Sequence, residues 1–375
     1  MDIARRLLVA AFLACIACAA SVASPFRAAA GPGECLPAPT VPGVTEGRSR
    51  PGTVAPSVGT LRAVLLLVHA ADAPPGDSVA EPRELIDSAR AWFRSVSYGR
   101  LELRVETVPR WFPLPARSPE YVSDAGRYLA DAVAAADPYV DFSEFDVVYI
   151  APSSRTPATA TSAILNGFGV RADGKEVQLW IPFPAGYAEA GDVPMLVHET
   201  GHLLGLPDLY ASGSPRTFHR WDVMAFRWPS ELLAWHRWKL GWLGQDAIVC
   251  LTGGSSRTVT VSPIGRSGGT RAVFLRRGRQ ILAVEVREKS GYDTSLCETG
   301  VLIYEVDQTP FKRSPVHIYA AQSDSRPPGR SCASLWNAPF DVGRGEVRSL
   351  RLPGMRVDVL GRHADGSYRV RVTAR

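Results

Sequence analysis

Three absences narrow the function of this sequence. No block of Lys and Arg stands out, although the formal net charge is +5, so a nucleic-acid partner has little support. Beyond the first 23 residues no cysteine belongs to a Cys-x-x-Cys pair, which argues against a cysteine zinc site. No apolar run after the N-terminal segment approaches the ~20 residues that a membrane-spanning helix needs. The sequence thus predicts neither a nucleic-acid-binding protein nor a membrane-spanning one.

The N-terminal segment has the composition of an export signal. Arg5 and Arg6 precede the apolar run of residues 7–20, and small side chains follow at residues 21–23. This order predicts a secretory signal peptide over residues 1–23 and a secreted, extracellular protein. A twin-arginine route, or lipid attachment at Cys15 or Cys18, remains an alternative.

The remaining chain, of 375 residues in all, has the composition of a globular protein, with 46% hydrophobic and 21% charged residues. Residues 24–60 are rich in Pro, Gly, Ala and Ser and predict a flexible leader or short pro-segment. Hydrophobic periodicity predicts strands at 62–70, 101–105, 145–150 and 176–183, and helices at 81–96, 120–136, 192–204 and 229–240. We therefore predict an α+β protein, with a mixed twisted sheet over 61–245 and a β-rich region over 246–375.

The most specific motif is residues 198–208, His-Glu-Thr-Gly-His-Leu-Leu-Gly-Leu-Pro-Asp. Four residues apart on a helix, His198 and His202 project from one face and can share one metal ion. Gly205 would end the helix, which allows Asp208 to supply a third ligand. Three protein ligands with one open position are typical of catalytic zinc, whereas structural zinc has four. We therefore predict one catalytic Zn²⁺ ion.

Glu199 is the predicted catalytic residue. It lies about 100° around the helix from His198, so it faces a water on the metal rather than the metal itself. A carboxylate there can act as general base for peptide-bond hydrolysis through a zinc-bound water. The sequence thus predicts a monomeric zinc metalloendopeptidase that acts on polypeptide substrates. No further cofactor-binding residue is indicated, and calcium, although possible, has no EF-hand pattern to support it.

Alternatives remain for both the ligand set and the function. His219 could replace Asp208 as the third ligand, but it lacks the short spacing from the helix. A five-residue His-Glu-x-x-His string also occurs by chance on surface helices, although the apolar residues around this one indicate a packed helix. The protein could instead be a non-catalytic exported binding protein with a metal-stabilised helix, or a zinc amidase acting on cell-wall peptides.

Residues 198–210 resemble the snapalysin motif, in which aspartate replaces the third histidine of the metzincins. The wider layout resembles the immune inhibitor A type of secreted zinc metalloprotease, which carries an HExxHxxGxxD motif. The residues that carry this resemblance are Trp92–Leu101, the turn Trp221-Asp-Val-Met224 and the segment Trp235-His-Arg-Trp-Lys-Leu-Gly-Trp242.

The resemblance covers about residues 60–245 and implies a zincin-like or metzincin-like catalytic domain. It implies that Met224 forms a Met-turn beneath the zinc ligands, and Tyr210 could orient or stabilise the oxyanion. A buried structural role for Tyr210 is the alternative. Larger proteases of the immune inhibitor A type differ from this sequence, which has a short pro-segment and no long C-terminal extension. Whether a latent form exists is therefore left open.

Four cysteines remain after the signal peptide and predict two disulfides in an exported protein. Sequence allows three connectivities, of which we prefer Cys250 with Cys297 and Cys35 with Cys332. As an alternative, Cys35 could bind the catalytic zinc as a thiolate in a latent form.

Overall fold

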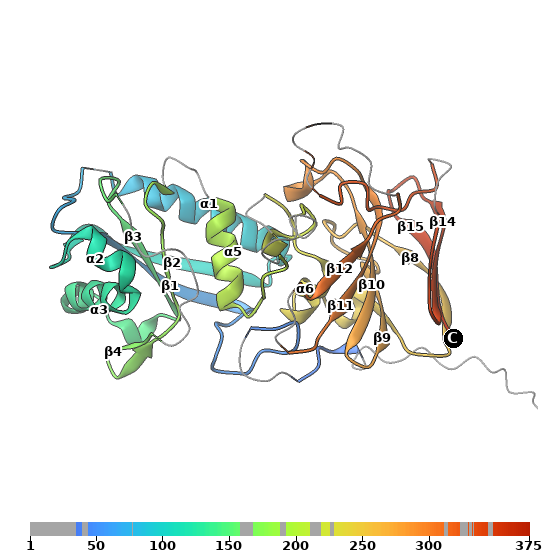
Figure 1. Cartoon of the computed structure of the whole chain (residues 1–375), viewed down its shortest axis with the longest axis horizontal. Helices are drawn as coiled ribbons and strands as arrows, with labels where there is room; N and C mark the ends of the chain where they lie inside the picture. Colours follow the sequence, from blue (N-terminus) through green and yellow to red (C-terminus); the bar gives the residue numbers. More distant parts are fainter. Residues whose placement is uncertain are drawn as a thin grey trace, which may run out of the picture.

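The computed structural model describes residues 35–39, 44–76, 78–157, 168–187, 193–210, 219–225, 229–310, 314–322, 329, 332, 334–343 and 348–375. The predicted signal peptide and the start of the predicted leader lie outside this range. Within it, no helix has both the length and the apolar character that crossing a membrane requires. Figure 1 shows a helix-containing part at one end of the molecule and a β-rich part at the other.

The first part is built on a four-stranded sheet in the order β2-β1-β3-β6. Its strands are β1 (Gly59–His69), β2 (Leu101–Pro113), β3 (Val147–Pro152) and β6 (Trp180–Pro182). Every pairing among them is parallel, so the prediction of a mixed sheet is wrong for the described strands. The strands can pair in parallel because a long connection, which contains a helix or a hairpin, separates each strand from the next along the chain.

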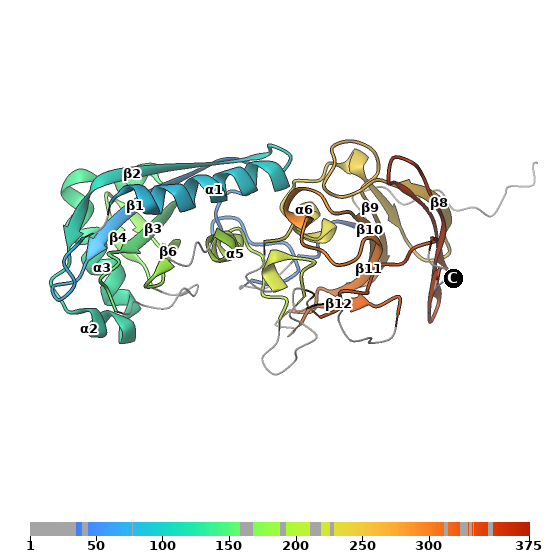
Figure 2. The same ribbon diagram turned by 90° about the horizontal axis from the view of Figure 1, so that it is seen from above.

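Helices cover both faces of this sheet (Figure 2). They are α1 (Ala80–Val96), α2 (Ser118–Ser123), α3 (Ala125–Ala136) and α5 (Val193–Leu203). Strand β1 is buried on both sides because its two alternating sets of side chains join different cores. Leu65 and Leu67 pack in the core that contains α1 and α5, whereas Leu66 packs in the core that contains α3. The sheet thus places α5, which carries the metal-binding motif, beside α1.

Several element boundaries differ from the prediction. The helix predicted over 120–136 is two helices, because the Asp124 side chain accepts a bond from Arg127 N at 2.9 Å and caps the second. The strand predicted over 176–183 divides between a hairpin and the main sheet, and the helix predicted over 229–240 is confined to α6 (Ala234–Lys239). The hairpin is β4 (Val170–Ala172) with β5 (Lys175–Val177). Short 3₁₀ helices are Asp137–Tyr139, Phe142–Glu144, Val223–Ala225, Gln245–Ala247 and Gly291–Asp293.

The C-terminal part is built mainly from two β-sheets. One sheet has the order β12-β11-β10-β9-β7, and the other has the order β13-β14-β15-β8. Their facing sides enclose a core in which valine predominates. The bounds are β7 (Ile248–Leu251), β8 (Ser256–Val261), β9 (Ala272–Arg277), β10 (Gln280–Arg287), β11 (Gly300–Asp307), β12 (Val316–Tyr319), β13 (Ser349–Leu352), β14 (Met355–Arg362) and β15 (Tyr368–Ala374).

The described part of the predicted leader is bonded to α6. Glu46 is 1% exposed and accepts a hydrogen bond from Trp235 Nε1 at 3.0 Å. Trp238 Nε1 donates to Cys35 O at 3.0 Å, and Trp242 Nε1 donates to Ser57 O at 2.6 Å. We call residues 44–58 the N-terminal strap. Its packing differs from the expected flexible leader, because the composition shows many Pro and Gly residues but not the Glu46 carboxylate and the backbone carbonyl groups that accept bonds from tryptophan.

The strap also contacts the end of α5. Ala55 N donates to Leu203 O at 2.8 Å. Lys239 Nζ donates to Gly205 O at 2.6 Å and also to Thr45 O. These bonds satisfy carbonyl groups where α5 ends, and they connect that end to α6. The strap therefore holds α5 against the C-terminal part.

Two disulfides join Cys35 to Cys250 and Cys297 to Cys332. The preferred pairing of the sequence analysis is therefore wrong, as is the zinc-binding role considered for Cys35. The physical reason is the path of the N-terminal segment, which carries Cys35 to strand β7, where Cys250 lies. The spacing of the cysteines along the sequence gives no information about which strand the N-terminal segment reaches.

The two disulfides close loops of very different length, with sequence separations of 215 and 35 residues. Loop entropy then gives about 5 kcal/mol for the Cys35–Cys250 bond and about 4 kcal/mol for the other. We expect Cys35→Ser/Cys250→Ser to lower the free energy of unfolding by about 1.5 kcal/mol more than Cys297→Ser/Cys332→Ser, as measured by urea titration. Peptide mapping without reductant should show the same two bonds, and any other pairing would contradict this connectivity.

Candidate metal centre

The helix that carries the two histidines packs closely on the turn that follows it. A side chain at Gly201 would place its Cβ only 2.7 Å from Met224 Sδ, so any other residue here would force the Met224 side chain to move. Gly205 has φ +98° and ends the helix, with Gly205 N donating to His202 O at 2.8 Å and Leu206 N donating to Gly201 O at 3.0 Å. A left-handed glycine is a common end for a helix. It turns the chain back so that Asp208 returns to the face that carries His198.

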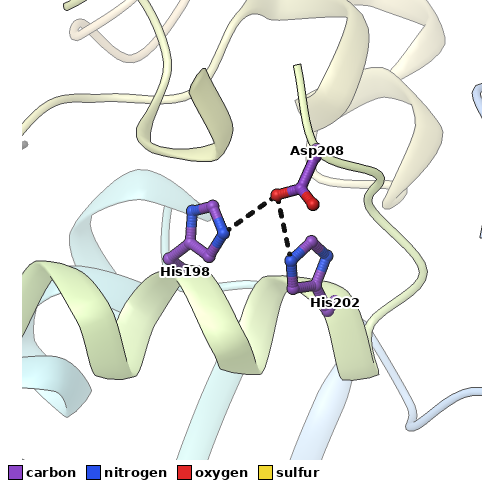
Figure 3. A group of neighbouring side chains, drawn as sticks. All are labelled: His198, His202 and Asp208. Atoms are coloured by element: carbon purple, nitrogen blue, oxygen red, sulfur yellow. Dashed lines mark hydrogen bonds and ion pairs between the residues drawn. The ribbon is translucent and has the colours of Figure 1, made fainter. Parts of the chain in front are cut away.

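The three predicted ligands lie together (Figure 3). Asp208 Oδ1 is 3.1 Å from His198 Nε2 and 3.3 Å from His202 Nε2. One ligand atom from each residue lies within 4.8 Å of the others. Two ligand atoms bound to tetrahedral zinc at 2.0–2.2 Å are about 3.3–3.6 Å apart, so small shifts of the Asp208 side chain would bring these separations to those around such an ion. The donor set of two imidazoles and one carboxylate is also one that zinc accepts.

Backbone carbonyl groups orient both imidazole rings. His198 Nδ1 is 2.9 Å from Val223 O, and His202 Nδ1 is 2.7 Å from Leu206 O. A carbonyl oxygen only accepts, so each Nδ1 carries the proton and donates it. The Nε2 atoms of the neutral rings then have their lone pairs directed to Asp208, as metal ligation requires.

The charge distribution of the site favours an ionised Asp208. Burial alone would raise the pKa of its carboxyl, but the protonated forms of His198 and His202, which donate through Nε2 and carry positive charge, hold that pKa well below its usual range. Burial acts to lower the pKa of His198, and the Asp208 and Val223 hydrogen bonds together with the charge of Glu199 more than offset it, so the pKa is raised. The site thus supplies a negative carboxylate next to two nitrogen ligands.

The other predicted site residues lie around this group. Glu199 is 7% exposed and follows His198 on α5. The ring of Tyr210 stacks on that of His198, with centroids 6.2 Å apart and planes at 25°. Met224 is fully buried beside Gly201, and its carbonyl accepts a bond from Leu209 N at 3.0 Å. That bond joins the turn at Met224 to the segment that carries Asp208.

His219, the alternative ligand, lies outside the group of three. It is 2% exposed, and its Nδ1 accepts a bond from Trp221 N at 3.3 Å. Burial lowers its pKa to about 4, so it is neutral near pH 7. Within the described residues, the candidate metal group contains Asp208 and not His219.

A buried chain of charges supports the turn below the metal group. The Asp222 carboxylate accepts bonds from Met224 N at 2.7 Å and Leu233 N at 2.8 Å. It also accepts from His236 Nδ1 at 2.8 Å, and His236 Nε2 is 3.1 Å from Glu46 Oε1. This path leads from the N-terminal strap to residues 222–224, whose Val223 carbonyl orients His198.

Sequence reasoning missed three members of this arrangement. Asp222 and His236 lie within the two tryptophan-containing motifs and could have been suspected from them. Glu46 lies in a Pro- and Gly-rich segment without periodicity and gave no signal. Backbone carbonyls such as Val223 O are invisible to motif analysis, because every residue carries one.

We expect Asp208→Ala to lower zinc affinity by more than about 100-fold, because it removes one of three ligands, whereas losing a residue that only supports a ligand costs about 10–100-fold. Competition with a zinc-chelating dye measures this affinity. His219→Asn is the comparison, and it should retain the metal. Retention by Asp208→Ala together with loss by His219→Asn would transfer the ligand role to His219.

The pKa of His236 provides a pH test of the buried chain. Burial opposes its charge, but Asp222 and Glu46 raise its pKa to about 10. This stabilisation is fully present below pH ~6.5 and is lost as pH rises towards 10. Burial lowers the pKa of nearby Lys239 to about 8, so this second cation beside Glu46 also disappears in that window, whereas His219 titrates well below it.

Glu46→Gln should therefore lower the free energy of unfolding by about 2–3 kcal/mol at pH 7. The loss should shrink between pH 7 and pH 10, because the cations that Glu46 faces are then neutral in the wild type as well. Urea titrations at several pH values test this, with exposed Glu106→Gln as the control. A pH-independent loss would show that Glu46 does not act through His236.

No protein-family model matches the sequence, and no curated protein is similar to it in sequence. Among solved structures, metalloproteinase-II from Bacteroides fragilis is similar at 14% identity and a TM-score of 0.27. The similarity covers 50% of this chain and 53% of that chain, so only about half of the neighbour is matched.

Proposed function

We propose that this protein is a secreted zinc-dependent endopeptidase that hydrolyses peptide bonds in proteins. The observation that carries the proposal is the convergence of His198 Nε2, His202 Nε2 and one Asp208 oxygen at separations close to those around one zinc ion. Three protein ligands leave one position for water or substrate, which is what a catalytic zinc needs.

We further propose that residues 61–245 form a zinc metalloprotease domain of the zincin or metzincin type, related to immune inhibitor A. What supports this is the buried Met224 beside Gly201 of the active-site helix, where a Met-turn would lie. The β-rich residues 246–375 would then be a separate region, joined to the protease domain through α6, the strap and the Cys35–Cys250 bond.

A zinc ion in this site would supply a Lewis acid for the scissile carbonyl and lower the pKa of water towards about 7. Glu199 adjoins the ligand His198 and, as a carboxylate, would accept the proton of the attacking water and later deliver it to the leaving amine. Tyr210, stacked on His198, would orient or stabilise the developing oxyanion. The Val223 and Leu206 carbonyls would keep both imidazoles in the ligating tautomer.

The two disulfides are compatible with an extracellular protein, because such bonds persist in oxidising compartments. Export by a signal peptide at residues 1–23 and a monomeric state belong to the proposal. A binding protein that used zinc only to stabilise its helix would need no carboxylate at position 199. Glu199 therefore favours catalysis over a scaffold role.

The decisive variant is Glu199→Gln, which keeps the size of the side chain and removes its basicity. We expect hydrolysis of casein to fall by about 10²–10⁴-fold, because a positioned general base contributes that much. Zinc affinity and thermal stability should stay near the wild-type values. The assay is the release of casein peptides by purified protein, with chelator-treated wild type as a second inactive sample.

Exposed Glu106→Gln is the matched control and should retain full activity. Wild-type rates in Glu199→Gln would refute the mechanism. Tight zinc binding without chelator-sensitive hydrolysis of any polypeptide would favour the scaffold instead, and cleavage restricted to cell-wall peptides would favour an amidase.

A further inference from the structure

The two parts of the chain differ in charge. Residues 246–375 contain 20 Lys and Arg against 12 Asp and Glu, whereas the whole chain contains 42 against 37. The C-terminal part is therefore strongly positive and the remainder is slightly negative. Such an asymmetry is typical of a protein that has an anionic partner on one side.

Part of this excess lies on one face of the sheet β13-β14-β15-β8, which carries four arginines and one aspartate. Along β14 and β15 the buried residues are valines such as Val357 and Val370, which pack in the core between the two sheets. Side chains alternate across a strand, so the residues between those valines point outward. The outward residues are Arg356, Asp358, Arg369 and Arg371 on these strands, Arg351 on β13, and Thr258 and Thr260 on β8. Figure 1 shows β14 and β15 at the end of the molecule far from α2 and α3.

Three of these four arginines form no ion pair with any residue that the structure describes. Arg356 pairs with Asp358 at 2.7 Å. Arg371 Nε donates to Thr258 Oγ1 at 3.4 Å, and among the described residues no ion pair is formed by Arg351, Arg369 or Arg371. Their guanidinium groups are exposed and available to carboxylate, phosphate or sulfate groups, which they bind in a bidentate manner.

One pairing on this face opposes folding. Arg351 lies directly opposite Arg356 across β13 and β14. Like charges in such a cross-strand pair are destabilising. Asp358 offsets part of this repulsion, because it pairs with Arg356 and lies directly opposite Arg371. A ligand with several negative groups would offset more of it.

We propose that this arginine face (Arg351, Arg356, Arg369 and Arg371) binds an anionic polysaccharide and thereby fixes the protein to an acidic extracellular matrix. Leu360 is the one large exposed apolar side chain of this face among the described residues, so the face lacks the apolar wedges that insert into a membrane. It also presents no aromatic side chain on which nucleic-acid bases could stack. A flexible polymer with repeated negative groups needs neither feature, because charge alone can recognise it.

The test compares two triple variants of the full-length secreted protein. Arg351→Gln/Arg369→Gln/Arg371→Gln removes the three unpaired arginines. Arg62→Gln/Arg90→Gln/Arg104→Gln removes the same charge from ion-paired, exposed positions at the other end of the molecule. Binding to heparin, as a sulfated polysaccharide probe, is measured at several salt concentrations, with neutral dextran as the uncharged reference.

We expect the wild type to bind heparin but not dextran. The first triple variant should bind at least about 10-fold more weakly, with a shallower salt dependence because fewer counterions are released. The control variant should bind like the wild type. Both variants should retain casein hydrolysis and the wild-type unfolding midpoint, so the result is independent of whether the proposed peptidase activity is correct.

Four outcomes would overturn the proposal. These are no binding of the wild type to heparin, equal losses in both variants, unchanged binding in the first variant, and tighter binding of duplex DNA or phosphatidylserine vesicles than of heparin. Equal losses would show that net charge rather than this face attracts the polymer. Preference for DNA or vesicles would identify a different class of partner.

Discussion

The buried carboxylate of Asp222 is the interaction on which the functional part of the structure depends. It fixes the backbone of the turn at Met224 and the start of α6 at Leu233 through two N–H groups, and it pairs with His236. The next residue in that turn, Val223, supplies the carbonyl that orients His198. One side chain therefore connects the candidate metal group, the turn at Met224 and the helix that receives the N-terminal strap.

Burying this carboxylate is costly, and the fold offsets the cost by neighbouring charge. Glu46, His236 and Asp222 are all fully or nearly fully buried, and the raised pKa of His236 reflects the two anions that it joins. Breaking one partner of such a group usually destabilises by several kcal/mol, although replacing the whole group by apolar side chains is often neutral. The charges of Glu46, His236 and Asp222 are therefore better explained by their effect on the position of the turn at Met224 than by a gain in stability.

The two parts of the molecule carry different candidate functions. The part that contains α5 brings the candidate metal ligands together. The sheet β13-β14-β15-β8 presents exposed arginines that pack against no other helix or strand of the described residues. The strap, Cys35 and α6 hold the two parts together through tryptophan N–H groups and one disulfide. Attachment to an acidic polymer at one end would leave the candidate catalytic group at the other part of the molecule accessible to substrates.

The sequence by itself determined those features that depend on local spacing. Hydrophobic periodicity placed β1, α1 and α5 nearly at their observed bounds, and the distance of four residues between His198 and His202 determined that both face one side of a helix. The proximity of Asp208 was also predictable, because Gly205 ends the helix only three residues earlier. The identity of a bound metal and the activity remain predictions from this pattern.

Only the tertiary structure decided the features that depend on distant contacts. It set the disulfide pairing, the parallel strands of the first sheet, the placement of Glu46 against His236, and the location of His219 outside the metal group. Sequence cannot supply these, because each requires segments that lie far apart in the chain to meet, and local periodicity contains no information about their relative path. The alternation of arginine and valine along β14 and β15 lies between the two cases: the pattern is local, but which side faces solvent is set by the sheet packed against it.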